Sequence, residues 1–291
     1  MRVTQSMLSN NMLRNLSNSY SKIGKYQEQI TTGRKFTRPS DDPVSTVKGM
    51  AFRTDLNKAE QFTRNIQTVN NWLDTTDDAL DQAGTALHRI KELLVQAAND
   101  TNTSSDRTKI KEEIEQIKLQ LRDIANTKVG NKYIFSGTKT LAPVFDESGM
   151  TGHINEEIVQ IEVFDGIKLD VNIPGKTLFG NIDNFMSNLS NLLNDDTKTG
   201  EDISEMLGDL DQLYEDVLAA RADIGARQNR VELMTNRLAL HETNVTKQLS
   251  ENEDVDYAKA ITEMITAESI HQAALSVGAK IIQQTLVDFI R

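Results

Sequence analysis

Apolar residues recur at alternating steps of three and four from residue 59 to residue 97. Eleven of the twelve positions are apolar, and Thr76 is the exception. The positions are Ala59, Phe62, Ile66, Val69, Leu73, Thr76, Leu80, Ala83, Leu87, Ile90, Leu94 and Ala97. A repeat of about 3.5 residues keeps one stripe of a helix against a partner, as in a coiled coil. The pattern predicts one helix from near Val44 to near Asn99, about 80 Å long at 1.5 Å per residue.

A second apolar stripe follows a short polar break at residues 99–105. Its positions repeat the three-four step and are Ile110, Ile114, Ile117, Leu121 and Ile124. Ser104 or Ser105 stands where a helix N-cap is expected. Because the break is short, we expect this helix to fold back antiparallel on the first.

A third stripe recurs at steps of seven from Ile203 to Val245. Its members are Ile203, Leu210, Val217, Ile224, Val231, Leu238 and Val245, which indicates a long helix with a coiled-coil seam. The second seam position changes from apolar to polar halfway along, with Arg227 and His241 there. We therefore expect a more polar or differently paired stretch beyond residue 226.

The segment between these helices has the period of strands. Tyr133-Ile134-Phe135 and Val144-Phe145 are short β-prone runs, and residues 167–173 alternate apolar and polar. Residues 131–179 therefore look like a small β-rich insertion. Helical spacing resumes at Ile182, Phe185, Leu189 and Leu192.

The two ends of the chain carry apolar residues that one slender molecule cannot cover. Met12, Leu16, Ile23 and Ile30 share one helical stripe, whereas apolar residues lie on most sides of the segment from residue 261 to residue 290. A helix that is apolar on most sides is buried on most sides. We expect other copies of the chain to cover it, and the ends to order only on assembly. The predicted assembly residues are Met12, Leu16, Ile23, Ile30, Ile261, Ile265, Leu275, Ile282, Leu286 and Phe289.

These patterns predict a mainly α fold, a long antiparallel coiled-coil helical rod with paired terminal helices and a small β insertion. The expected parts are an inner domain of residues 1–43 with 245–291, a helical rod of 44–130 with 180–244, and an outer insertion of 131–179.

Charge and composition exclude several classes of protein. The chain of 291 residues has 43 acidic and 32 basic residues, a net charge of −11, which argues against nucleic-acid binding. No apolar stretch is long enough for stable membrane insertion, and the start lacks the apolar core of a cleaved signal peptide. The absence of Cys excludes disulfides and thiolate metal sites.

The first 40 residues are basic, with seven Lys or Arg against Glu28 alone. Three interpretations stay open for this segment. The cations are the solvated side of an amphipathic helix, or they meet acidic surfaces of partner subunits, or they lie on an anionic membrane surface.

Candidate chemistry is sparse. The four histidines form no metal-binding motif, and we expect no cofactor or metal. Asp41 and Asp42 could be paired carboxylates of an acidic hydrolase. The alternative is a helix-start motif, Arg38-Pro39-Ser40-Asp41-Asp42-Pro43, in which Ser40 or Asp42 caps a helix whose first turn contains Pro43. Ser136-Gly137-Thr138-Lys139-Thr140 lacks the first Gly of a phosphate loop, and we interpret it as a turn.

Several segments together resemble the flagellin superfamily, and within it the proteins that join the flagellar hook to the filament. They are residues 2–7, Glu28 to Lys35, the motif at 38–43, Gly130 to Gly137, Ala222 to Arg230, and the ending from Ser276 to Arg291. Residues 145–200 match nothing specific. Flagellin itself is the nearest alternative, and a soluble coiled-coil adaptor is an alternative from another class.

The resemblance implies a structural role with no enzyme activity. Proteins of this kind leave the cytoplasm through the flagellar type III export apparatus and assemble in the extracellular flagellum. The implied partners are other copies of the chain, the first hook-filament junction protein, flagellin and a cytoplasmic export chaperone of the FlgN type.

Overall fold

A computed structural model describes residues 5–98, 104–147, 149–152, 154–194 and 200–287. The fold is mainly α with small antiparallel strand pairs, as the sequence predicted. The described helices are α1 (Gln5–Thr32), α2 (Pro43–Ala97), α3 (Ser104–Ala125), α4 (Gly175–Asn194), α5 (Gly200–Glu253) and α6 (Tyr257–Val287).

Contacts divide the chain into two compact units. Unit 1 comprises Met1–Lys58 and His241–Arg291, and unit 2 comprises Ala59–Leu240. Helices α2 and α5 contribute to both. The division into three parts expected from the sequence stays a prediction.

The coiled-coil stripes form the core of unit 2. Eleven of the twelve positions predicted on α2 are buried, Thr76 among them, and Phe62 is partly buried against the core. Thr76 is tolerated there because its hydroxyl donates to the carbonyl of Trp72 at 2.7 Å. The five stripe residues of α3 and the first six of α5 belong to the same core, and the seventh, Val245, is buried within unit 1. The spacing of apolar residues therefore located these three helices correctly.

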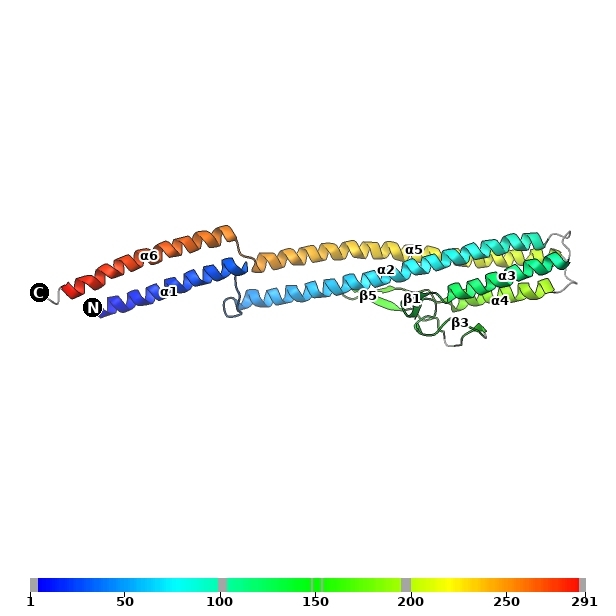
Figure 1. Cartoon of the computed structure of the whole chain (residues 1–291), viewed down its shortest axis with the longest axis horizontal. Helices are drawn as coiled ribbons and strands as arrows, with labels where there is room; N and C mark the ends of the chain where they lie inside the picture. Colours follow the sequence, from blue (N-terminus) through cyan, green and yellow to red (C-terminus); the bar gives the residue numbers. More distant parts are fainter. Residues whose placement is uncertain (1–4, 99–103, 148, 153, 195–199, 288–291) are drawn as a thin grey trace. The chain divides into compact units, whose positions relative to one another are not determined.

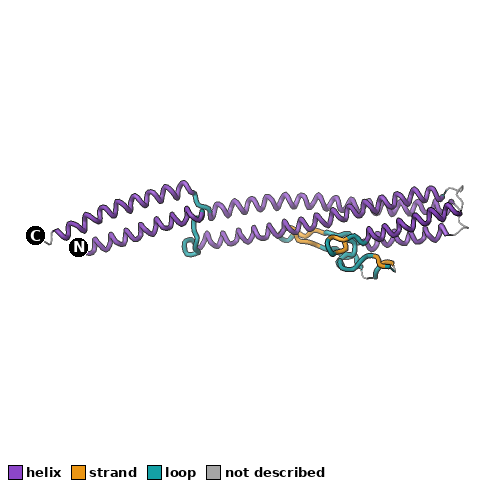
Figure 2. The backbone as a smooth tube through the Cα atoms, in the orientation of Figure 1, coloured by secondary structure: helices purple, strands orange, loops and turns teal. Residues whose placement is uncertain are grey.

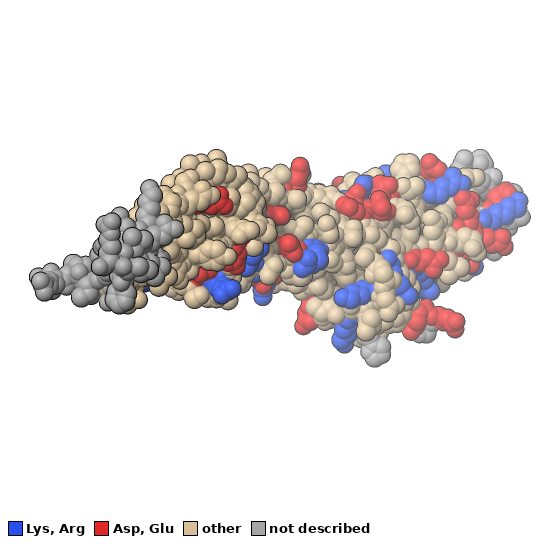
Figure 3. Space-filling model, turned by 60° about the vertical axis from the view of Figure 1, so that its left-hand side comes forward, with Lys and Arg blue, Asp and Glu red and all other residues tan. Residues whose placement is uncertain are grey.

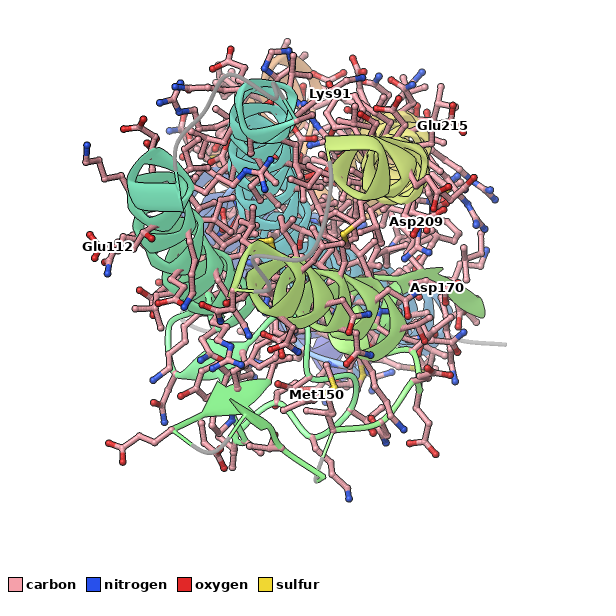
Figure 4. All side chains as sticks on the ribbon, turned by 90° about the vertical axis from the view of Figure 1, so that its right-hand side faces the viewer. Lys91, Glu112, Met150, Asp170, Asp209 and Glu215 are labelled. Carbon is pink, nitrogen blue, oxygen red and sulfur yellow. The ribbon has the colours of Figure 1, made fainter. Side chains whose placement is uncertain are left out.

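Ion pairs link the helices of unit 2, and two of them show that α2 and α5 run antiparallel. Lys91 of α2 binds Asp211 of α5 at 2.6 Å. Arg221, further along α5, binds Asp77, which lies earlier on α2, at 2.9 Å. Arg122 of α3 likewise binds Asp183 of α4 at 2.8 Å. Viewed end-on, the helices enclose the core, and Glu112, Asp209 and Glu215 project from its outside (Figure 4). The acidic run that begins α5 is thus mostly a solvated face.

The chain forms three two-stranded antiparallel sheets after α3 and before α4, and strands make up little of the unit (Figure 2). They are β1 (Lys128–Val129) with β2 (Lys132–Tyr133), β3 (Phe145–Asp146) with β4 (Gly149–Met150), and β5 (Gln160–Phe164) with β6 (Ile167–Asp170).

Two strand predictions extended too far, and β5 was missed. Strand β2 ends at Tyr133, because Ile134 and Phe135 turn into the core, where both are completely buried. The carbonyl of Phe135 accepts the N–H of Gly175 at 2.9 Å. Strand β6 ends at Asp170, after which Asn172 bonds the N–H of Val159 at 2.6 Å through its side chain.

The β5–β6 hairpin packs on the helices beside it. Phe164 stacks on Phe62 of α2 with ring centroids 6.1 Å apart, and Arg237 of α5 lies 4.5 Å above the same ring. Arg227 donates to the carbonyl of Asn172 at 3.0 Å. The polar position expected on α5 beyond residue 226 is therefore paired with the β segment.

Helices α1 and α6 of unit 1 lie side by side and antiparallel (Figure 1). The chain leaves α1 at Gly33, whose φ of 72° places it in the left-handed region that suits glycine. The carbonyl of Gly33 accepts the N–H of Val255, which precedes α6, at 2.9 Å. The segments that enter and leave the terminal pair are thus bonded to each other.

Candidate assembly surface

Helix α6 turns small residues toward α1. Ala260 and Gly278 are buried and Ala267 and Ala274 are half-buried, at the spacing of one helical stripe. A Cβ on Gly278 would overlap the terminal methyl group of Met12. Small side chains at a contact permit a short distance between helix axes, and Cα atoms of α1 and α6 approach within 8 Å. The terminal helices therefore pair closely where these small residues meet α1, and the larger Met264 and His271 are half-buried on the same side of α6.

The same arrangement leaves large apolar side chains of α6 exposed. Ile265 is 55% exposed, Ile270 59% and Val277 56%, and all three belong to helix α6. On α1, Leu13 and Tyr20 are 60% and 71% exposed. Charged side chains are sparse on the visible face of this pair (Figure 3). Scattered single apolar residues are normal on a surface, but a contiguous apolar patch marks an interaction site.

The residues predicted for assembly fall into three groups. Met12, Leu16, Ile23 and Ile30 are half-buried on the side of α1 that faces α6. Ile261, Ile265 and Leu275 are exposed on α6. Ile282 and Leu286 lie in α6 but their side chains are outside the described part, and Phe289 lies outside the described residues altogether.

The predicted set left out Leu13 and Tyr20, which the structure exposes beside α6. These two residues are seven apart, so they share a helical face, and this spacing was the available signal. It was hidden because the neighbouring stripe through Met12 and Leu16 is more regular.

A groove runs between α1 and α6 on one side of the pair. Its volume is about 520 Å³, and its walls are mostly apolar. The lining residues are Asn11, Met12, Asn15, Ile270, Ala273, Ala274 and Val277.

One hydrogen bond and one aromatic ring contact cross the same pair. The Tyr26 hydroxyl donates to the carboxylate of Glu263; burial and this carboxylate together raise the pKa of Tyr26. Tyr20 and His271 have their ring centroids 6.1 Å apart, and Nδ1 of His271 is buried without a hydrogen-bond partner among the described residues.

Glu253, the last residue of α5, joins the helices of unit 1. Its side chain is 8% exposed and forms ion pairs with Arg53 of α2 and with Arg34, which follows α1. Its carbonyl accepts the N–H of Lys35 at 2.7 Å. Asn252 beside it donates to the carbonyl of Ser45 at 2.8 Å. No local pattern in the sequence predicts this cluster, because its members on α2 and α5 are about 200 residues apart.

The motif at residues 38–43 starts α2. Pro43 is the first helical residue, and Asp42 accepts the N–H of Ser45 at 3.0 Å and its hydroxyl at 2.7 Å. These two hydrogen bonds lower the pKa of Asp42. Asp41 accepts the N–H of Arg38 at 3.2 Å, within the preceding turn. Both carboxylates are thus engaged in local backbone structure, with Asp42 as the N-cap.

No described helix is long and apolar enough to span a membrane. The described side chains also contain no cluster of three or more His, Asp or Glu that could hold a metal ion.

Comparison with known families assigns both ends of the chain. The bacterial flagellin N-terminal helical region matches residues 3–140, and the bacterial flagellin C-terminal helical region matches residues 207–290. The terminal helices that form the exposed surface lie within these matches. The chain belongs to the bacterial flagellin family.

Individual relatives include both branches of that family. The chain is 27% identical to flagellar hook-associated protein 3 of Escherichia coli, over 93% of each chain. It is 26% identical to flagellin of Bacillus subtilis, over 98% of this chain and 97% of the other. The crystal structure of Bacillus cereus FlgL shares the fold, with a TM-score of 0.60 and 24% identity over 69% of this chain and 99% of that one.

Proposed function

We propose that this chain is the structural subunit that joins the hook of the bacterial flagellum to its filament. The proposal is supported by its likeness, over 93% of both chains, to a hook-associated protein. It assigns the chain an assembly role and no catalytic role.

The observation that carries the assembly role is the exposure of large apolar residues on a paired terminal helix. Ile265, Ile270 and Val277 are more than half exposed while α6 remains packed on α1 through small residues. Burying one such side chain contributes about 1.5–3 kcal/mol. Docking of several of them on neighbouring subunits is therefore strongly favourable, and we propose that other copies of the chain cover them.

The further partners follow from the same role. A junction subunit contacts the first hook-filament junction protein on one side and flagellin on the other. Before that it is held in the cytoplasm by an export chaperone of the FlgN type and passes through the type III export apparatus to the cell exterior. We propose this route because the chain resembles a flagellar hook-associated protein over 93% of both chains.

A filament subunit is the second candidate, favoured by the 26% identity to Bacillus subtilis flagellin along nearly the whole of both chains. The soluble coiled-coil adaptor is set aside, because both ends of the chain match flagellin terminal regions.

Deletion of the gene separates the two candidates. The junction role predicts cells with hooks but no filaments, and flagellin lost to the medium, because filament subunits are still exported but have no base to assemble on. Complementation with the intact gene restores filaments. Normal filaments in the deletion strain would contradict the junction role, and loss of the main filament protein itself would favour the filament subunit.

A further inference from the structure

We propose that the turn between β5 and β6 is a site of covalent self-modification, at which Asp165 rearranges to isoaspartate with Glu162 as the base. The peptide bond to Gly166 then runs from the side-chain carboxyl group of Asp165 in place of its backbone carboxyl group. This reaction depends on one turn of the chain and not on the proposed assembly role.

The turn consists of the two reacting residues. Phe164 is paired with Ile167, so Asp165 and Gly166 alone connect the two strands. Both are exposed, and Gly166 has a φ of 73°, in the left-handed region that favours glycine. The dipeptide Asp-Gly occurs once in the chain, and its amide counterpart Asn-Gly does not occur.

The nitrogen of Gly166 is unhindered. Glycine has no side chain beside this nitrogen, and even a Cβ built on Gly166 would have no atom within 4 Å beyond its chain neighbours. The nitrogen and the carboxyl carbon of Asp165 close a five-membered ring. Because both belong to one chain, no second reactant has to be brought to the site.

Glu162 is placed to take up the proton that this nitrogen must lose. The N–H of Gly166 donates to Oε1 of Glu162 at 3.0 Å, which is within the reach required of a general base. The backbone that carries this base is itself held in place, because the carbonyl of Glu162 accepts the side-chain amide of Asn65 on α2 at 2.7 Å.

The reaction balances without a further reactant. The nitrogen of Gly166 bonds to Cγ of the protonated Asp165 carboxyl group while Glu162 takes up the amide proton. The departing hydroxyl group takes that proton and leaves as water. Water then opens the succinimide at the backbone carbonyl carbon of Asp165, the nitrogen stays on Cγ, and the isoaspartyl chain has the original mass.

The product is expected to detach the hairpin from the helices. Isoaspartate adds one carbon to the main chain of a two-residue turn, and the length of such a turn fixes the register of its strands. Phe164 precedes the turn, stacks on Phe62 of α2 with ring centroids 6.1 Å apart, and lies 4.5 Å below Arg237 of α5. A change of register moves this ring away from both helices.

The modification is tested on the purified full chain, kept at neutral pH for several weeks. Isoaspartate is counted with protein L-isoaspartyl methyltransferase and located by peptide mapping with electron-transfer fragmentation. We expect it to accumulate at residue 165 above every other aspartate. Gly166→Asn is expected to slow it several-fold, since asparagine tolerates a left-handed φ but crowds the nitrogen. No isoaspartate at residue 165, or an unchanged rate in Gly166→Asn, would overturn the inference.

Glu162→Gln tests the base, because it keeps the size of the side chain and removes its basic carboxylate. We expect the folded variant to form isoaspartate several-fold more slowly than the native chain. In concentrated urea the two chains are expected to react at the same rate, because Glu162 and Gly166 are no longer held together. Equal rates in the folded chains, or the same slowing in urea, would overturn the role of Glu162.

Amide exchange tests the consequence. In the aged chain, the isoaspartyl fraction is expected to exchange faster than the native fraction at residues 160–170 and equally at residues 110–124 of α3. Equal exchange at residues 160–170 would show that the hairpin stays attached and would overturn this part of the inference.

Discussion

The carboxylate of Glu253 lies where a side chain on Gly49 would begin. A Cβ added to Gly49 would overlap Oε1 of Glu253 and stand 3.3 Å from the side-chain nitrogen of Asn252. The carboxylate cannot move aside without leaving Arg53 and Arg34. Residue 49 must therefore be glycine, because Glu253 of α5 fills the space beside it, although glycine weakens a helix interior.

Gly49→Ala is expected to destabilise the chain by about 1–3 kcal/mol, the usual cost of overpacking a filled site. Gly208→Ala is the matched control, since it is also in a helix and a Cβ there has nothing within 4 Å. There the same change stabilises by about 0.5–1 kcal/mol through helix propensity. Denaturant unfolding of the two variants measures the difference, and stabilisation by both would contradict the packing at Glu253.

Glu253→Gln removes the charge but little volume. We expect a loss of about 1.5–3 kcal/mol, because a nearly buried carboxylate then no longer binds two arginines. Glu251→Gln is the control: its carboxylate is 68% exposed and 4.0 Å from Lys247, so the change is expected to cost under about 1 kcal/mol. Amide exchange around residues 33–35 and 252–255 should accelerate only in Glu253→Gln. Unchanged exchange there would show that Glu253 does not hold the helices of unit 1 together.

Asp42 gives the chain a pH-dependent contribution to stability. Its pKa is lower in the folded state, so its stabilisation is complete above the unfolded pKa of an aspartate and is lost as pH falls through the folded value. Asp42→Asn keeps an acceptor for Ser45 but has no charge. The advantage of the native chain over Asp42→Asn is therefore expected at neutral pH and should vanish in acid. A constant difference in melting temperature from neutral to acid pH would rule out this role.

The long helices were predictable because their seams are regular. The stripe residues on α3 and α5, and nearly all of those on α2, became core, since a 3.5-residue repeat leaves few other ways to bury them. For the β segment, only its position along the chain was predictable, and the bounds of its strands were not. Strands of two to five residues are ended by tertiary contacts, such as the bond between Phe135 and Gly175, which local alternation does not contain.

The assembly surface was predicted only in outline. The hydrophobic pattern predicts an apolar α6 but does not separate its large residues from the stripe of α1. In the structure Met12 packs toward Gly278, whereas Ile265 and Leu275 point away. Which apolar residues face the partner helix depends on the small residues between them, and alanine and glycine do not stand out in a hydrophobic pattern.

Exposed apolar residues of α6 are expected to become covered when copies assemble, and thiol labelling at position 265 measures this directly. Ile265→Cys provides a single thiol in a chain without cysteine, at a site that is 55% exposed in the single chain. The account predicts rapid reaction with a maleimide in the purified chain and strong protection in isolated flagella that contain it. Equal labelling in both states would show that neighbouring copies do not cover this face and would contradict the account.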